Sequence, residues 1–173
     1  LAKEIVRRDD EVDRLYLFIV RQLKGAVGNR LLVEEIGLSH PRDCLGYRLI
    51  VKSIERSADH AARIAKEIST LETPLGEQII ENLVAVSELA SEIQESSMKA
   101  LYKYDAELVH ETMAKVRNVA EFEEEIIEEL LKLQINARTI VSIRLILESM
   151  RRIAEYGTDI AEIAVNLHFK TPS

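Results

Sequence analysis

Hydrophobic residues recur every three or four positions along most of the chain, which is the spacing of one face of an α-helix. In the first segment these positions are Val6, Val12, Leu15, Ile19 and Leu23. They predict an amphipathic helix over residues 2–24. Glycines at positions 25 and 28 weaken its continuation, although an apolar side persists as far as Gly37.

Four more helices follow from the same spacing and from residues that favour helix ends. Ser39, with a proline close behind it, predicts the start of the second helix, and Thr73 is placed to cap the third. A corner near Asp105 separates the third helix from the fourth, and the capping residue Asn136 separates the fourth from the fifth. The predicted helices span about residues 2–24, 39–69, 74–103, 106–133 and 136–168. The fold class is therefore all-α, with about five long antiparallel helices.

The second and the last of these helices are similar in sequence when one is shifted by 96 positions. The matches include charged residues, such as Arg56 with Arg152, which a hydrophobic stripe alone would not fix. A weaker match at a shift of 110 relates the first helix to the fourth, and it pairs Asp13 with Glu123. The chain therefore contains a duplicated helical unit.

Composition narrows the class of protein. Of 173 residues, 47% are hydrophobic and 31% are charged, which favours a globular chain over a disordered one. The formal charge of −7 repels phosphate backbones and anionic lipids, so we expect no direct contact with nucleic acid. No apolar run approaches the ~20 residues of a membrane span, so we expect no membrane insertion. The single cysteine, Cys44, fits a reducing compartment and predicts a cytoplasmic protein.

Two pairs of acidic residues are spaced four positions apart, so each pair shares one helix face. The first pair is Asp9 with Asp13, and the second is Glu55 with Asp59. Brought together on adjacent helices, they would supply the hard oxygen ligands that Fe(III), Mn(II), Mg(II) or Ca(II) prefer. The alternative is a solvated acidic face with ion-pair neighbours such as Lys52.

The other reactive residues indicate no catalytic chemistry. Glu107 and His110 have the Glu-x-x-His spacing of di-iron bundles, but the motif occurs once and those sites need it twice. His60 is expected to be a packing or surface residue. The sequence contains no glycine-rich phosphate loop and no nucleophile elbow. We therefore expect a protein that is not an enzyme.

Residues 54–65, which read IERSADHAARIA, resemble the signature of the PhoU family of phosphate-uptake regulators, with Arg63 where that family often has asparagine. A second copy at residues 151–161 keeps an arginine, an acid and the Ile-Ala pair. Asp9 and Asp13, with Val12 between them, are similar to the family's other acidic motif. Together with the duplication, the resemblance covers nearly the whole chain.

The resemblance implies tandem PhoU-like three-helix bundles, often dimeric, whose acidic motifs can bind multinuclear iron or other metal clusters. The first repeat, residues 1–72, shows two of its three helices, so an opening helix is expected upstream. The second repeat is residues 73–173. The metal ligands are then Asp9, Asp13, Glu55 and Asp59.

Glu123 and Glu155 are weaker metal candidates, because the second repeat departs from the acidic motif. An apolar residue and a cation, Arg151, stand where the first repeat has acids. A cation in a ligand position repels metal. We therefore expect Glu123 and Glu155 to be engaged by Arg151 or Arg152.

By resemblance, the protein regulates phosphate uptake through contact with the ATPase subunit of a phosphate ABC transporter or with a sensor kinase, as a homodimer. Two alternatives stay open. One is a helical dimerisation or regulatory module of a longer transcription factor or ion-transport regulator. The other is a carboxylate-bridged metal enzyme, against which the single Glu-x-x-His motif counts.

Overall fold

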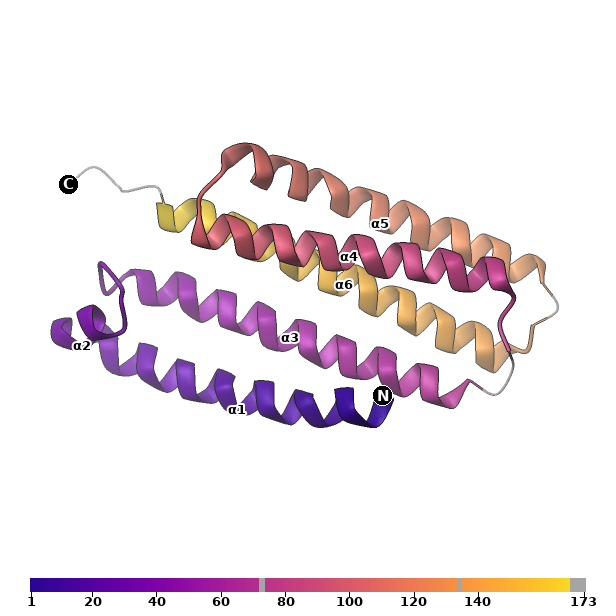
Figure 1. Cartoon of the computed structure of the whole chain (residues 1–173), viewed down its shortest axis with the longest axis horizontal. Coiled ribbons are helices and arrows are strands. Elements are labelled where there is room, and N and C mark those ends of the chain that lie inside the picture. The colour runs from indigo at the N-terminus through magenta and orange to yellow at the C-terminus, as the bar shows by residue number, and fades with distance from the viewer. Residues whose placement is uncertain (72–73, 134, 169–173) are drawn as a thin grey trace.

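Long antiparallel helices make up most of the computed structural model, which describes residues 1–71, 74–133 and 135–168. Six helices lie within these residues, and Figure 1 shows how they run side by side. They are α1 (Ala2–Val27), α2 (Arg30–Glu35), α3 (Asp43–Thr70), α4 (Glu77–Tyr102), α5 (Ala106–Lys132) and α6 (Ala137–His168). The all-α class and the five predicted long helices are confirmed.

The apolar stretch after residue 28 forms a separate short helix, α2, rather than a continuation of α1. Asn29 causes the separation, because its side-chain oxygen accepts a hydrogen bond from the backbone N–H of Leu31 at 3.1 Å and so caps a new helix. Gly37 follows α2 with a φ of 78°, a left-handed conformation that glycine adopts without steric cost.

The predicted cap at Ser39 is wrong. Helix α3 begins at Asp43, because the chain makes a turn at Pro41 and Arg42. The Asp43 carboxylate accepts a hydrogen bond from the backbone N–H of His40 at 2.9 Å, which stabilises this turn in place of an earlier helical one.

The other predicted caps have different outcomes. Thr73 lies outside the described residues, and the N-cap of α4 is Gly76. Near Asp105 only a corner was predicted, and the structure shows that Asp105 also caps α5, since its carboxylate accepts hydrogen bonds from two backbone N–H groups. Asn136 accepts a hydrogen bond from the backbone N–H of Thr139 at 2.9 Å, which confirms its predicted role at the start of α6.

Helix α6 is central, because it packs against α3, α4 and α5. The main core lies among α4, α5 and α6, and its fully buried residues include Val86, Ile93, Val119, Ile143, Leu147 and Ala154. Gly157 allows α4 to approach α6 closely, since a Cβ atom there would lie 2.8 Å from Cγ2 of Ile93.

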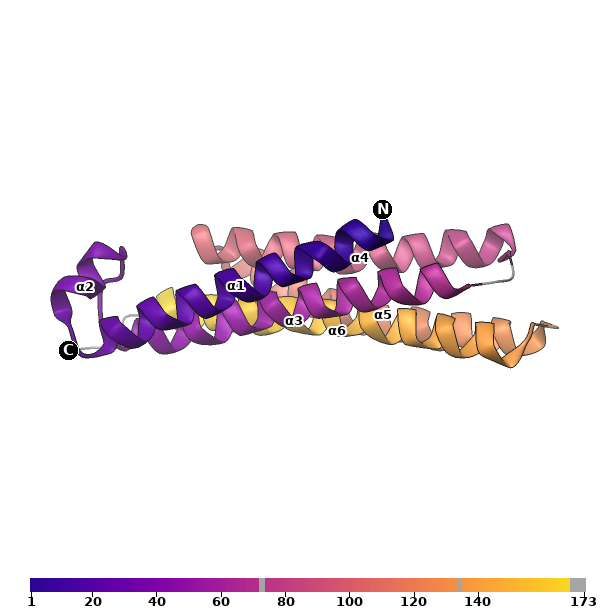
Figure 2. The same cartoon turned by 90° about the horizontal axis from the view of Figure 1, so that it is seen from below.

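Helix α1 is attached in a different way. Within the described residues it packs only on α2 and α3, and Figure 2 shows it running at an angle across α3. Its buried residues are Leu23 and Ala26, which form a small core with Val33 of α2 and Cys44 of α3. The far end of α1 therefore rests on α3 through half-buried contacts alone.

Among the described residues, no helix is long and apolar enough to cross a membrane. The division into repeats 1–72 and 73–173 stays a prediction.

Candidate metal centre

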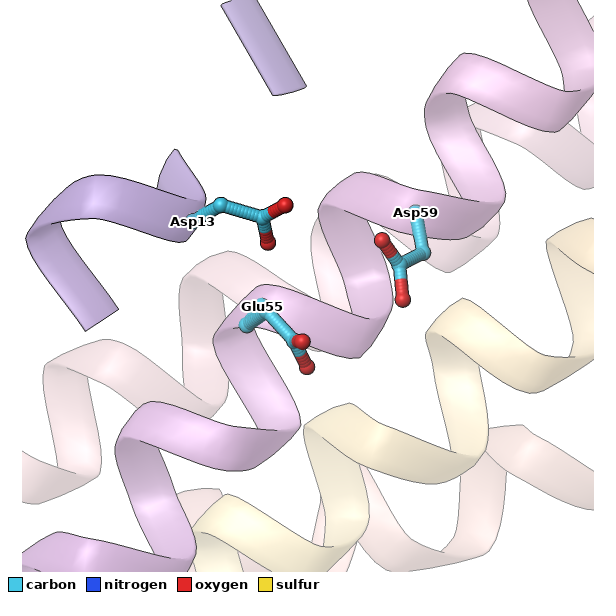
Figure 3. Close-up of side chains that lie close together, drawn as sticks. All are labelled: Asp13, Glu55 and Asp59. Atoms are coloured by element: carbon cyan, nitrogen blue, oxygen red, sulfur yellow. The ribbon is translucent and has the colours of Figure 1, made fainter. Parts of the chain in front are cut away.

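Three carboxylates from two helices converge where α1 crosses α3. One oxygen atom each from Asp13, Glu55 and Asp59 lies within 4.8 Å of the other two. Figure 3 shows Asp13 reaching from α1 toward Glu55 and Asp59, which lie one turn apart on α3. The structure thus brings together three of the four acids proposed from the sequence, here named the first cluster. Their role as metal ligands stays a prediction.

Asp9 lies beside the first cluster, one helical turn before Asp13 on α1. It is half-buried, and among the described residues its buried Oδ1 atom has no hydrogen-bond partner. Burial, followed by the negative charges of Asp59 and Asp13, raises the pKa of the Asp9 carboxyl above its usual value. Asp9 is therefore near enough to interact with the cluster, although it is outside the group within 4.8 Å.

The first cluster concentrates negative charge. Burial raises the pKa of Asp59, and the charges of Glu55 and Asp13 raise it further. Lys52 offsets part of this charge, because its ammonium group donates a hydrogen bond to Glu55. The predicted ion-pair role of Lys52 is thus confirmed for one carboxylate. A bound cation would relieve the remaining repulsion among the carboxylates.

The donor set is made of oxygen atoms, which suits hard cations such as Fe(III), Mn(II) or Mg(II). His60 lies next to Asp59 in sequence, but its ring packs 5.9 Å from that of Tyr156 on α6. Burial, with the positive charge of Arg63, lowers the pKa of the His60 imidazole. This contact with α6 fits a packing role for His60, but its buried Nδ1 atom has no hydrogen-bond partner among the described residues, so the ring is packed without being fully satisfied.

A second group of charges joins α5 to α6, and its carboxylates Glu123 and Glu155 are here named the second cluster. Arg151 donates to Glu123 from Nε at 2.8 Å and also to Glu155. Arg152 donates to Glu155 at 2.9 Å. The expectation that arginines engage these acids is confirmed.

One residue of this network, Arg144, was missed by the sequence reasoning. It pairs with Glu123, which is buried with only 8% of its side chain exposed. The internal repeat aligns Arg144 with Arg48, but an alignment does not show which partner an arginine takes. Glu107 and His110 are both exposed on α5, so the single Glu-x-x-His motif lies on the surface.

The fold and the first cluster together define a helical-bundle protein with a carboxylate centre between two helices. A family model described as PhoU domain matches residues 1–68 and 83–164. The chain therefore belongs to the PhoU domain family, a regulatory family of phosphate uptake that is not known as enzymatic. No curated protein matches the chain.

Proposed function

We propose that this protein regulates phosphate uptake by contacting the ATPase subunit of a phosphate ABC transporter or a sensor kinase, and that it does so as a homodimer. Membership of the PhoU domain family supports this proposal. The exposed apolar surface also supports a role in protein contact, because monomers rarely expose large apolar patches. On α1 this surface includes Leu15, Leu17 and Phe18, each more than half exposed.

A second apolar feature lies between α3 and α4. It is a groove of about 600 Å³, whose lining includes Ile64, Ile68, Leu71, Ile80, Leu83 and Val84. Such a groove accepts apolar side chains from another helix more readily than it accepts a phosphate ion. The surface chemistry therefore favours regulation by protein contact over direct binding of phosphate at this groove.

The regulator's cofactor is proposed to be iron or another hard metal ion, held by Asp13, Glu55 and Asp59 with Asp9 beside them. The convergence of three carboxylate oxygens within 4.8 Å carries this proposal. The unpartnered Oδ1 atom of Asp9 fits it, because a buried polar atom without a partner is costly. Glu123 and Glu155 remain weaker candidates, since arginines already engage them.

A metal at the first cluster would join α1 to α3. It would favour the arrangement in which the two helices are in contact, and any partner that recognises this arrangement would bind more tightly when metal is present. Lys52 contacts one oxygen of Glu55, Oε2, and leaves Oε1 for a metal. Its ammonium group, on a flexible stem, can also turn toward solvent.

The metal proposal is tested by elemental analysis of protein purified without chelator. The double variant Asp13→Asn, Asp59→Asn should lose most of the bound metal. The control Glu11→Gln, Glu111→Gln removes the same charge from exposed positions outside the cluster and should keep it. Equal metal content in the wild type and the Asp13→Asn, Asp59→Asn variant would contradict the metal site.

The regulatory proposal is tested by phosphate uptake in cells that lack the protein. Loss of the protein should change how the uptake rate responds to external phosphate, and the wild-type chain should restore the response. An uptake rate that is the same with and without the protein, at low and at high phosphate, would contradict it.

A further inference from the structure

The second cluster already contains a cation, and the chain itself supplies it. The guanidinium group of Arg151 bridges Glu123 on α5 and Glu155 on α6. It thus joins two helices through carboxylates, as a metal at the first cluster would. In the internal repeat Arg151 aligns with Glu55, 96 positions earlier, so a cation stands where the first repeat has a carboxylate.

The positive and negative residues of one ion pair change places between the two repeats. Lys52 and Glu55 form an ion pair three residues apart on α3. Their counterparts on α6 are Glu148 and Arg151, so both positions change sign together. One charge of each sign is kept on the helix, while the positive group moves from the edge of the first cluster to the middle of the second.

The arginines near the two clusters also take different partners in the two repeats. In the second repeat Arg144 pairs with Glu123 and Arg152 pairs with Glu155. Their first-repeat counterparts lie instead over tyrosine rings. Arg48 stacks on Tyr16, at 5.0 Å from the ring centroid. Among the described residues no arginine pairs with a carboxylate of the first cluster.

Arg56, the counterpart of Arg152, lies 5.7 Å from the centroid of the Tyr156 ring. Arg48 and Arg56 therefore lie over aromatic rings, and the acid whose charge Arg56 partly offsets, Asp159 on α6, lies outside the first cluster. The first cluster keeps carboxylates that lack guanidinium partners, whereas the second cluster is neutralised by three guanidinium groups.

Arg151 is also hard to displace. Its side chain is 26% exposed and that of Glu123 is 8% exposed, so water screens their attraction less than it screens a surface pair. A guanidinium group presents several N–H donors in a rigid fork and can serve two carboxylates at once. Lys52 makes a single ion pair, to Glu55.

We infer that Arg151 is the resident cation of the second cluster, so that metal added to this protein loads the first cluster alone and strengthens only the contact of α1 with α3. The inference rests on the proposed metal site for its first-cluster part. Its second-cluster part, that Arg151 joins α5 to α6 without metal, stands on the ion pairs themselves. Metal then strengthens the contact of α1 with α3 and leaves the contact of α5 with α6 unchanged.

Hydrogen exchange measures the two contacts separately. Metal-free wild-type protein is compared with and without Mn²⁺, and exchange is followed in peptides from α1 and α5. Mn²⁺ should slow exchange in α1 about tenfold and leave α5 unchanged, because local protection follows the stability of each unit. Slower exchange in α5 on adding Mn²⁺ to the wild type would overturn the inference.

The role of Arg151 is tested without any metal. Arg151→Met leaves Glu123 buried without that partner, so exchange in α5 should become at least about tenfold faster. The control Arg117→Met removes an exposed arginine from α5 and should leave its exchange unchanged. If Arg151→Met does not fold, Arg151→Lys keeps one charge and should show a smaller increase. Unchanged exchange in α5 in the folded Met or Lys variant would overturn the inference.

These results separate the two possible failures. If the proposed metal site is wrong, Mn²⁺ changes exchange in neither helix, while Arg151→Met still loosens α5. If Arg151 is not the resident cation, its removal has no effect on α5, whatever Mn²⁺ does to α1.

A reciprocal variant restores the charges of the first repeat in the second. Glu148→Lys, Arg151→Glu should bind about twice the Mn²⁺ of the wild type, measured by elemental analysis after equilibration at one Mn²⁺ concentration. Glu148→Gln, Arg151→Gln is the control, since it removes the cation without adding a carboxylate. Equal Mn²⁺ in the reciprocal variant and this control would count against Arg151 as the residue that excludes metal.

Discussion

Helices α1 and α5 are counterparts in the internal repeat, yet they are buried to very different extents. Helix α5 lies against both α4 and α6 and has six buried residues, one of them the charged Glu123. Helix α1 has two, both near its C-terminal end. The difference shows that an amphipathic pattern sets which face of a helix can be buried, whereas the number of neighbouring helices sets how much of it is.

The comparison is strongest between two leucines, one on each helix, where the same truncation should have very different effects. Leu130 on α5 is 1% exposed and Leu15 on α1 is 60% exposed. Leu130→Ala should lower the free energy of unfolding by about 2–5 kcal/mol, because it removes buried methyl groups and leaves a cavity. Leu15→Ala should change it by less than about 0.5 kcal/mol. Urea denaturation of both variants measures the difference, and equal losses would mean that α1 is covered as fully as α5.

A second test concerns the close approach of α4 to α6 at Gly157. In Gly157→Ala the new methyl group would meet the side chain of Ile93, at a cost of about 1–3 kcal/mol. The higher helix propensity of alanine returns about 1 kcal/mol. A net loss of stability in thermal unfolding is therefore expected. The control Gly28→Ala adds a methyl group with no atom within 4 Å, so its melting temperature should stay near that of the wild type. A more stable Gly157→Ala variant would show that α4 can move away.

The smallest effect expected is the pH dependence that Asp9 and Asp59 contribute in the metal-free protein. The pKa values of Asp9 and Asp59 are raised in the folded state, so the folded protein binds more protons than the unfolded chain between the usual value of 3.8 and the raised values. These two groups therefore destabilise the fold as pH rises through that window, the reverse of the behaviour of a carboxylate in a salt bridge.

The variant Asp9→Asn, Asp59→Asn isolates this contribution. It should be more stable than the metal-free wild type at pH 7, by less than about 1 kcal/mol because water screens partly exposed charges. The gap should close as the pH falls toward 4. Thermal unfolding across this range measures it, and a gap that widens at low pH would contradict the raised pKa values.

Much of the fold could be predicted from the sequence, because long helices leave a regular apolar spacing and mark their ends. Asn136 was found in this way, since a cap acts on backbone atoms within three residues. At Asp105 the sequence predicted a corner, and the structure adds its role as a cap. The predicted cap at Ser39 was wrong because the start of α3 depends on more than the residues that usually begin a helix. The Asp43 carboxylate instead accepts a hydrogen bond from the backbone N–H of His40 and stabilises a turn before α3. A polar residue shortly before a proline is compatible both with a helix capped by Ser39 and with this turn.

The candidate site was predictable in part. The spacing of Glu55 and Asp59 fixes them on one helix face, so their proximity follows from local geometry. The meeting of α3 with Asp13 depends on how α1 crosses it, which the internal repeat only suggests. Ion pairs between long side chains on different helices, such as Arg144 with Glu123, are set by the distance between the helices, which the sequence pattern does not contain.

The attachment of α1 at one end has a mechanical consequence. Its 26 residues form a rod about 39 Å long, given a rise of ~1.5 Å per residue. The small core around Leu23 and Ala26 would be the fixed point of this rod if it turned on α3. Turning it by roughly 10° about this point sweeps the opposite tip, about 34 Å away, through about 6 Å. A lever of this kind roughly doubles, at its free tip, any displacement of the helix near its middle, where Asp13 lies.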